Sequence, residues 1–470
     1  MKISKLLYLM ATALLLVSCE DDDSFSTSKS NLLLFSTDTV KVDTVFSNVP
    51  SSTRSLWVYN HTNDGIRCSS IQLERGNQSG FRVNVDGTYL SSTLGYQVQN
   101  VEIRKGDSIR VFVEVTTPQQ NQANPQKIED NLIFNLESGA SQKVNLNAWS
   151  WDATRLNNLV IKNDTTISSS KPIVVYGGIK VNEGATLTLA AGTTLYFHND
   201  AGIAVSGTLK SIGTAQSPVV LRGDRLDNMF DYLPYDYVSG QWQGIHLNAT
   251  SYNNIVEYTD LHSAYNGIVA DSCDLSREKL TLSSSTIHNC QGAGVSLTHC
   301  KATIENTQIT NTLNDCLLIA GGDVTVNNCT LAQFYPFDSK RGAAIHFSAP
   351  LQNMICRNTL ITGYADDVMT ADKSDVFNYQ FEDCIIRTPK ITTDDSLHFT
   401  RVLFENPEDT AKTGKKHFRK IDIENLRYDF RLDSISPAIG RANTSTALPL
   451  DRNGLKRDDK PDVGAYEWKK

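Results

Sequence analysis

Two segments of the chain combine aromatic side chains with charged ones, a combination suited to holding a polar ligand such as a sugar. They are residues 225–240 and residues 334–342. Aromatic rings can stack on sugar faces, while carboxylates accept hydrogen bonds from hydroxyl groups. The predicted ligand-binding residues are Tyr232, Tyr235, Tyr237, Trp242, Tyr335 and Phe337. The alternative is that these rings only shield the flank of the fold.

The charged residues of the same region match the needs of two classes of carbohydrate enzyme only in part. A polysaccharide lyase needs a Lys or Arg base and a positive charge beside a uronate, for which Lys340 and Arg341 near Asp315 are the candidates. A glycoside hydrolase needs two carboxylates about 5–10 Å apart. The candidate pairs are Asp315 with Asp338, and Asp366 with Asp367. The sequence has neither a nucleophile elbow nor a phosphate-binding glycine loop, so catalysis is not the leading expectation.

A six-residue repeat defines the elements that must position these side chains. Its template is apolar, any, polar, small, any, apolar, where the small residue is Thr, Ser or Cys. Copies start at residues 256, 282, 304, 326, 356 and 381, so successive starts differ by 26, 22, 22, 30 and 25 residues. One unit of about 22 residues forms three short strands and cannot bury its inner face alone, so we expect the units to stack as rungs about 4.8 Å apart. The pattern therefore predicts a β-solenoid.

Stacking places equivalent residues of successive rungs in rows. The small position gives a predicted buried row of Thr259, Ser285, Thr307, Cys329, Thr359 and Cys384. The position before it includes Asn306, Asn328 and Asn358, which we expect to hydrogen-bond along a turn. Because Cys329 and Cys384 replace Thr and Ser, we predict that they are small buried fillers. The other cysteines after residue 19 are also expected to be free thiols.

A second strand follows each repeat, and its period-two alternation decides which side chains face solvent. The predicted inward row is Ile245, Ile268, Val295, Leu317 and Ile345, and the predicted outward row is His246, Val269, Ser296, Leu318 and His346. Four rung steps, roughly 19 Å, separate the two histidines, so they cannot share one ion whose ligands sit about 2 Å away. Asp366 and Asp367, with Asp315 two rungs earlier, are the candidates for Ca²⁺, and no other cofactor is expected.

The segment before the repeats has a different pattern. Short strands with turn residues between them run over residues 36–153, and alternation puts Val111, Val113 and Val115 on one face. This pattern is typical of a β-sandwich. A Ser- and Asp-rich tether precedes it, and the solenoid follows it. The predicted divisions are a tether over 19–35, a sandwich over 36–153, a solenoid over 154–400, and C-terminal rungs with a cap over 401–470.

Several motifs resemble those of a known family. They are Gln241–Leu247, Asn253–Tyr258 and Asn266–Ile268, with Ser436–Ile439 and Pro461–Glu467 near the C-terminus. The chain resembles surface lipoproteins of the Bacteroidetes type, with a pectate-lyase-like β-helix and an N-terminal immunoglobulin-like domain. The resemblance implies an all-β fold, a right-handed parallel β-helix preceded by a small β-sandwich. It says little about activity, because this fold hosts lyases, hydrolases and adhesins.

The first residues have the pattern of an export leader. Two lysines precede an apolar stretch over residues 6–17 that is too short to span a bilayer. The motif Leu16-Val17-Ser18-Cys19 resembles the bacterial lipobox, which implies that residues 1–18 are removed and Cys19 is lipidated. The following Glu20–Asp23 resembles the acidic export signal of Bacteroidetes surface lipoproteins, which implies display on the outer membrane. An ordinary leader and a solvated acidic linker are the alternatives.

The charge balance narrows the choice of partners. The formal net charge is −8, and loss of the two leader lysines makes it −8 − 2 = −10. Such a chain lacks the Lys and Arg clusters needed to bind nucleic acid or to dock on anionic lipid. The leading hypothesis is a non-catalytic surface lipoprotein that binds carbohydrate or another surface partner along the β-helix. The alternatives are a polysaccharide lyase or glycoside hydrolase, and a structural component of a complex with an outer-membrane protein.

Overall fold

The computed structural model of the chain describes residues 24–122, 124–169, 171–230, 232–364, 368–408 and 414–469. The predicted lipidation site Cys19 and the Ca²⁺ candidates Asp366 and Asp367 lie outside these residues. The chain divides into two compact units, the first ending at Trp151 and the second starting at Asp152. This division lies within two residues of the boundary predicted from the change of pattern. Each unit is all-β and has its own core.

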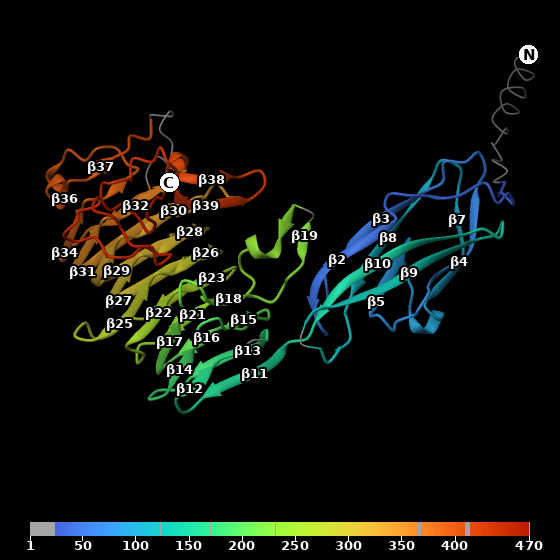
Figure 1. Ribbon diagram of the computed structural model, residues 1–470, viewed down its shortest axis with the longest axis horizontal. Coiled ribbons are helices and arrows are strands. Elements are labelled where there is room, and N and C mark those ends of the chain that lie inside the picture. Colours follow the sequence, from blue (N-terminus) through green and yellow to red (C-terminus); the bar gives the residue numbers. More distant parts are fainter. Residues whose placement is uncertain are drawn as a thin grey trace, which may run out of the picture. The chain divides into compact units, whose positions relative to one another are not determined.

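The first unit is a sandwich of two five-stranded sheets (Figure 1). One sheet contains, in spatial order, β1 (Leu34–Phe35), β3 (Arg54–Tyr59), β8 (Ser108–Val115), β5 (Phe81–Val85) and β6 (Thr88–Tyr89). The other contains β2 (Thr39–Phe46), β10 (Ser141–Trp151), β9 (Gln126–Leu136), β4 (Ile66–Leu73) and β7 (Gln97–Ile103). Val111, Val113 and Val115 are fully buried in one core that also contains Leu132 and Val144 of the other sheet. The predicted alternation is therefore confirmed.

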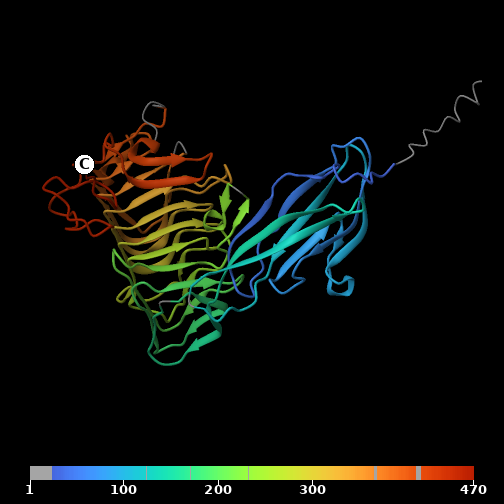
Figure 2. The same cartoon turned by 45° about the vertical axis from the view of Figure 1, so that its right-hand side comes forward.

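The second unit is a parallel β-helix whose 25 strands, from β11 to β37 without β19 and β20, join into one hydrogen-bonded sheet bent into three faces. We call these faces sheets 1, 2 and 3, in the order in which the chain of one rung crosses them. The register pairs each strand with its counterparts in the preceding and following rungs. Figure 2 shows the chain colour changing steadily from one end of this stack to the other.

The strands of the three sheets have the following bounds. Sheet 1 contains β16 (Ile203–Val205), β21 (Ile245–Leu247), β24 (Ile268–Ala270), β33 (Met369–Asp372), the later part of β11 (Thr154–Ile161) and β13 (Ile173–Val181), and the first part of β27 (Val295–Glu305), β29 (Leu317–Asn327) and β31 (Ile345–Arg357). Sheet 2 contains β12 (Thr165–Ile167), β14 (Thr186–Leu189), β17 (Thr208–Ile212), β22 (Asn254–Glu257), β25 (Glu278–Ser283), β34 (Phe377–Glu382), β36 (Phe399–Thr400) and the later part of β27, β29 and β31. Sheet 3 contains β15 (Thr194–Phe197), β18 (Val219–Gly223), β23 (Thr259–His262), β26 (Thr286–Cys290), β28 (Gln308–Thr312), β30 (Thr330–Gln333), β32 (Leu360–Gly363), β35 (Ile385–Ile386), β37 (Leu403–Phe404) and the start of β11 and β13.

The predicted rows exist and explain why the repeat has its template. The inward row of sheet 1, Ile245, Ile268, Val295, Leu317 and Ile345, is buried and paired rung to rung. All six residues of the small row are buried. The polar position before each small residue turns the chain from sheet 2 to sheet 3 with a positive φ, for example +47° at Asn306 and +50° at Asn328. Asn adopts this left-handed conformation more readily than most residues, so the turn selects it.

The predicted bonding among the turn asparagines is corrected by the structure. Instead of bonding to one another, Asn306, Asn328 and Asn358 each hold the C-terminal segment of the chain. Asn306 donates from Nδ2 to the carbonyl of Leu450, and Asn328 accepts from the amide of Leu448. The reason is that the C-terminal segment lies along this turn and satisfies the amide side chains there.

The range 401–470, predicted as C-terminal rungs with a cap, contains one further rung strand among its described residues, followed by a covering segment. The last rung strand is β37, after which β38 (Phe418–Asp422) and β39 (Arg427–Leu432) pair as an antiparallel hairpin. The hairpin and the segment after it share a core with the outward side of sheet 3, including Phe334, Leu360 and Val463. In both views the hairpin lies at the end of the stack near β30 and β32 (Figure 1, Figure 2). The C-terminal residues therefore cover a face and do not extend the stack.

The described residues contain few helices and no disulfide. The helices are single 3-10 turns, η1 (Ser92–Leu94), η2 (Tyr235–Tyr237), η3 (Asp394–His398) and η5 (Gly414–His417). None of the helices in the described ranges is long and apolar enough to cross a membrane. The eight described cysteines are free, as predicted, and burial raises the pKa of the Cys329 thiol to about 12.

Candidate functional site

A groove runs over the outward face of sheet 1. One hollow of about 520 Å³ spans the rungs of β11 to β24, and a second of about 370 Å³ spans those of β24 to β31. Asn266 and Val269 line both hollows, so the two join end to end. The groove therefore follows the axis along which the rungs stack.

The floor of the groove is a single row of outward side chains, one for each rung. Each member pairs in register with the next: Val160, Lys180, Ala204, His246, Val269, Ser296 and Leu318. Successive members are about 4.8 Å apart because they lie on neighbouring parallel strands. Lys180, Ala204 and His246 are exposed, so a ligand can reach the floor. An extended ligand lying here would meet the same backbone geometry at every rung.

Glycines form the edge of the groove where the chain enters sheet 1. A Cβ on Gly244 would lie 1.7 Å from the carbonyl oxygen of Asn266, and one on Gly202 would lie 3.0 Å from that of Gly244. The turns of successive rungs are thus stacked too closely for a side chain. Because these positions lack side chains, the edge is low and leaves backbone groups within reach of a ligand.

The charged groups in and beside the groove are mixed in sign, and the two histidines among them are paired with carboxylates. His246 Nε2 lies 2.9 Å from Asp271 Oδ1, and the two ring nitrogens of His346 each lie 3.0 Å from a carboxylate, Asp315 and Asp372. Burial opposes protonation of His346, but the bonds to Asp372 and Asp315 raise its pKa above its usual value. Lys180 has no carboxylate within ion-pair distance among the described residues. This environment suits a polar ligand of low charge.

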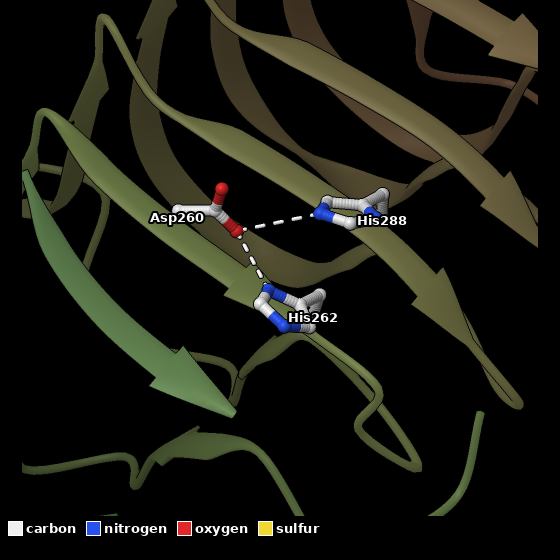
Figure 3. A group of neighbouring side chains, drawn as sticks. All are labelled: Asp260, His262 and His288. Atoms are coloured by element: carbon white, nitrogen blue, oxygen red, sulfur yellow. Dashed lines mark hydrogen bonds and ion pairs between the residues drawn. The ribbon is translucent and has the colours of Figure 1, made fainter. Parts of the chain in front are cut away.

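A second group of functional side chains lies on the outward face of sheet 3, close to the turn that leads back to sheet 1. Asp260 and His262 lie on β23, two residues apart and so on the same face, and His288 lies on the next rung, paired with His262. Oδ1 of Asp260 lies 2.8 Å from Nδ1 of His262 and 3.3 Å from Nε2 of His288 (Figure 3). The two rings are stacked with their centroids 4.8 Å apart. We call Asp260, His262 and His288 the sheet 3 cluster.

The loop that contains η2 closes one side of the sheet 3 cluster. Oδ1 of Asp236 lies 3.6 Å from Nε2 of His262, and Asp236 also pairs with Arg222. Burial alone would raise the pKa of the Asp260 carboxyl, but the two facing imidazoles hold it well below its usual range. Burial opposes protonation of His262, while Asp260 and Asp236 raise its pKa above the usual value. The cluster can therefore exchange protons or hold a cation.

Comparison with known proteins supports the fold and leaves the site open. A family model described as a right-handed β-helix region matches residues 243–396. The second unit is a right-handed parallel β-helix. No curated protein matches the chain. Among solved structures, the ASH/PapD-like domain 7 of human CEP192 matches at 10% identity, over 27% of this chain and 90% of that chain, with a TM-score of 0.17. Such a low TM-score gives no information on fold or function.

The predicted aromatic residues do not line the groove of the β-helix. Neither hollow is lined by an aromatic side chain of the two loops that the structure describes. Trp242 is 1% exposed and stacks on Phe197 in the core, and Tyr335 is buried with its hydroxyl 2.9 Å from that of Ser239. The prediction of ligand contact is therefore wrong for Trp242 and Tyr335. The Ser239–Tyr335 contact brings the two loops together at one edge.

The other predicted rings remain accessible in part. Tyr232 is 64% exposed and Phe337 is 44% exposed, whereas Tyr235 and Tyr237 are half-buried in η2. Tyr235 also packs under the guanidinium of Arg225, at 4.3 Å from ring centroid to cation. Tyr235 and Tyr237 fit the alternative given above, that the rings shield the flank of the fold, while ligand contact by Tyr232 and Phe337 stays a prediction.

The catalytic candidates are bonded to nearby backbone groups. Asp315 accepts a hydrogen bond from the amide of Ala343 and contacts His346, while Asp338 accepts from the amide of Lys340. Arg341 donates to the carbonyl of Tyr335. These hydrogen bonds are of the kind that stabilise a loop, and one of them joins the two candidates Asp338 and Lys340.

The sheet 3 cluster was missed by the sequence reasoning although a signal for it exists. Extending the six-residue repeat by one position gives His262 in the first copy and His288 in the second. Asp260 is the variable fifth position of the first copy. Equivalent positions on adjacent rungs must stack, so the repeat alone places these two histidines about 4.8 Å apart. Asp236 could not be found this way, because it comes from an irregular loop.

Proposed function

We propose that this protein is a lipid-anchored outer-membrane protein exposed at the cell surface, whose β-helix binds an extended carbohydrate in the groove over sheet 1 without cleaving it. The observation that carries the proposal is the continuity of the two hollows through Asn266 and Val269. A groove that repeats its geometry at each rung suits a ligand made of repeating units.

The lining of the groove supports a carbohydrate more than a peptide or a lipid. Its side chains include Asn158, Asp200, Gln243 and Lys180, which offer donors and acceptors to hydroxyl groups. Small apolar side chains such as Ala204 separate them on the floor. A lipid would need a deeper and more apolar hollow.

The anchor rests on the sequence of the leader. Cys19 lies two residues after the end of a short apolar stretch, and four acidic residues follow it. Two or three acyl chains hold a protein on a membrane far more firmly than one chain. A surface anchor would present the β-helix to polysaccharides outside the cell.

A substitution that fills the groove tests the proposal directly. Ala204→Trp places a bulky ring on the exposed floor, and Thr166→Trp, on the exposed side of β12 in sheet 2, is the matched control. Neutral, uronate-containing and sulfated polysaccharides are compared by affinity electrophoresis. We expect at least one class to retard the wild-type chain and the control, and to bind Ala204→Trp about tenfold or more weakly.

Two further readouts separate this proposal from its alternatives. Retention that is unchanged in Ala204→Trp but lost in Tyr232→Ala would move the site to the aromatic loops. New reducing ends or unsaturated products during incubation would instead favour an enzyme. No retardation of the wild-type chain by any class would contradict carbohydrate binding.

A further inference from the structure

We infer that the sheet 3 cluster of Asp260, His262 and His288 is a binding site for a divalent first-row transition ion, for which Zn²⁺ is the probe. The site lies on a different face from the groove and does not depend on carbohydrate binding. It is held in place by one regular element, sheet 3, and by one irregular element, the loop that contains Asp236.

The spacing of the three side chains fits a single ion. Each offers one ligand atom, and these atoms all lie within 4.8 Å of one another. Zinc bonds to His nitrogen and carboxylate oxygen of about 2.0–2.2 Å put neighbouring ligand atoms roughly 3.4 Å apart in a tetrahedral site. The observed distances from Asp260 Oδ1, 2.8 Å and 3.3 Å, are somewhat shorter than this spacing. The Asp260 side chain is one-third exposed, so it has room to rotate away from the rings when an ion binds.

The rigid part of the site is set by the β-helix itself. His262 and His288 are paired in the register of β23 and β26, and their rings are inclined by only 24°. Both rings point away from the core because Leu261 and Ile287, the residues before them, point inward. Two imidazoles held in this way lose little freedom when an ion binds, which favours binding.

An independent observation comes from the far side of His262. Its Nε2 is buried without a hydrogen-bond partner and faces Oδ1 of Asp236, 3.6 Å away, an oxygen that also pairs with Arg222. If Nδ1 of His262 binds the ion, the proton of this ring must lie on Nε2, where it faces the Asp236 carboxylate. Carboxylates commonly hold metal-binding histidines in this way, fixing the tautomer and the orientation of the ring.

The position of Asp236 is fixed by its own backbone. Its carbonyl accepts hydrogen bonds from Ser263 Oγ at 2.8 Å and from Asn289 Nδ2 at 3.2 Å. Ser263 and Asn289 each directly follow a histidine of the cluster on the chain. Arg222, on the preceding rung, pairs with the Asp236 carboxylate and balances its charge. The loop is thus attached to the same two rungs that supply the ligands.

The ligand set selects the class of ion. Two imidazoles and one carboxylate suit Zn²⁺ and its first-row neighbours, whereas Ca²⁺ takes six or more oxygen ligands. Three protein ligands leave one position open, as in zinc sites that bind a water molecule or a substrate. Asp260 and His288 are partly exposed, so solvent reaches that position.

A direct binding measurement tests the inference. Zn²⁺ is titrated into the chelator-treated full chain by calorimetry, and Co²⁺ is used in parallel as an absorbing substitute. We expect one ion per chain and the intense absorption of Co²⁺ in a low-coordinate site, without a thiolate charge-transfer band. Asp236→Asn removes the carboxylate that faces Nε2 of His262, and it should weaken Zn²⁺ binding about 10–100-fold. His288→Gln and Asp260→Asn should weaken it further.

The controls distinguish the cluster from other residues and from unfolding. His246→Gln removes an exposed histidine that also contacts one carboxylate, and it should leave Zn²⁺ binding unchanged. His288 is partly exposed, so His288→Gln should keep the unfolding temperature of the metal-free chain. Equal binding by the wild type, His288→Gln and Asp260→Asn would overturn the inference. A thiolate band would overturn it as well. So would no binding at all, which is the result expected if the two histidines only donate hydrogen bonds to Asp260.

Discussion

Sheets 1 and 3 of the β-helix are built from the same rungs, yet their outward faces differ. The face of sheet 1 is open and carries a groove, whereas the face of sheet 3 is covered by the loop of residues 225–240, the β38–β39 hairpin and the C-terminal segment. The histidines show the same contrast. His246 and His346 are four rungs apart on sheet 1, while His262 and His288 are on adjacent rungs of sheet 3.

The comparison shows that the rungs decide which residues are neighbours and that the irregular segments decide what those neighbours can do. On sheet 1 the described residues of the outward row face solvent, and the histidines among them pair with carboxylates from the same or adjacent rungs. On sheet 3 the same kind of row meets buried side chains that arrive from distant parts of the sequence. Gln308 on β28, for example, accepts a hydrogen bond from the hydroxyl of Tyr466, 158 residues further along the chain.

The largest effect is expected when the buried ion pair of the C-terminal segment, which covers sheet 3, is removed. Arg457 is buried, pairs with buried Glu467 at 3.2 Å and donates to Asn306 and to the carbonyl of Gly464. Arg457→Met leaves the Glu467 carboxylate buried without its cation, so we expect a loss of about 3–5 kcal/mol in the free energy of unfolding. Chemical denaturation of the full chain measures this loss.

The matched control for Arg457 is the exposed pair of the hairpin. Arg431→Met removes a cation that is half exposed and 2.6 Å from Asp429, and it should cost less than about 1 kcal/mol. The double variant Arg457→Met with Glu467→Gln should recover part of the loss. A cost no larger than that of Arg431→Met would show that the covering is not held by this ion pair.

An intermediate effect concerns the turn that carries the covering segment. Asn358 has a φ of +47° and accepts from the amide of Asn443 at 2.8 Å, while its Nδ2 donates to Thr446 and Asn327. Asn358→Ala leaves these buried and half-buried partners unpaired and should cost about 2–4 kcal/mol in the free energy of unfolding. Asn358→Gly should cost about 1 kcal/mol less, because glycine adopts a positive φ without strain.

Asn199 provides the control for that turn. It has a similar φ of +50° but is exposed and not covered by the C-terminal segment. Asn199→Ala should therefore cost only the backbone strain, about 1 kcal/mol. Denaturation curves of the three variants separate the two contributions. Equal costs for Asn358→Ala and Asn199→Ala would mean that the covering segment adds nothing.

The smallest expected effect concerns the titration of His346, on the open face of sheet 1. His346 has a raised pKa, so its protonated form is favoured in the folded chain. Its contribution to stability is fully present below the unfolded value of about 6.5 and is lost as the pH rises through the folded value. Asp372→Asn removes an exposed partner and should lower the titration midpoint of His346, followed by NMR of the imidazole. A wild-type midpoint at or below 6.5, or one unchanged in Asp372→Asn, would contradict this expectation.

Much of the regular structure could be predicted, because each feature is encoded within one rung. Period-two alternation gave the inward row of sheet 1, and the repeat gave the buried small row. Asparagine occurs at positions 306, 328 and 358 because the backbone there has a positive φ. Trp242 was misassigned because an aromatic residue beside a loop has the same sequence pattern whether it faces solvent or the core.

By itself, the amino-acid sequence determined the stack of rungs and therefore the neighbours of every outward residue, including the pairing of His262 with His288. The tertiary structure decided which outward face stays open and which is covered. It brought Asp236 to His262 and the C-terminal segment to the turn asparagines. The physical reason is that rungs contact only adjacent rungs at a fixed spacing, whereas loops and tails have no period, and their contacts depend on the whole folded surface.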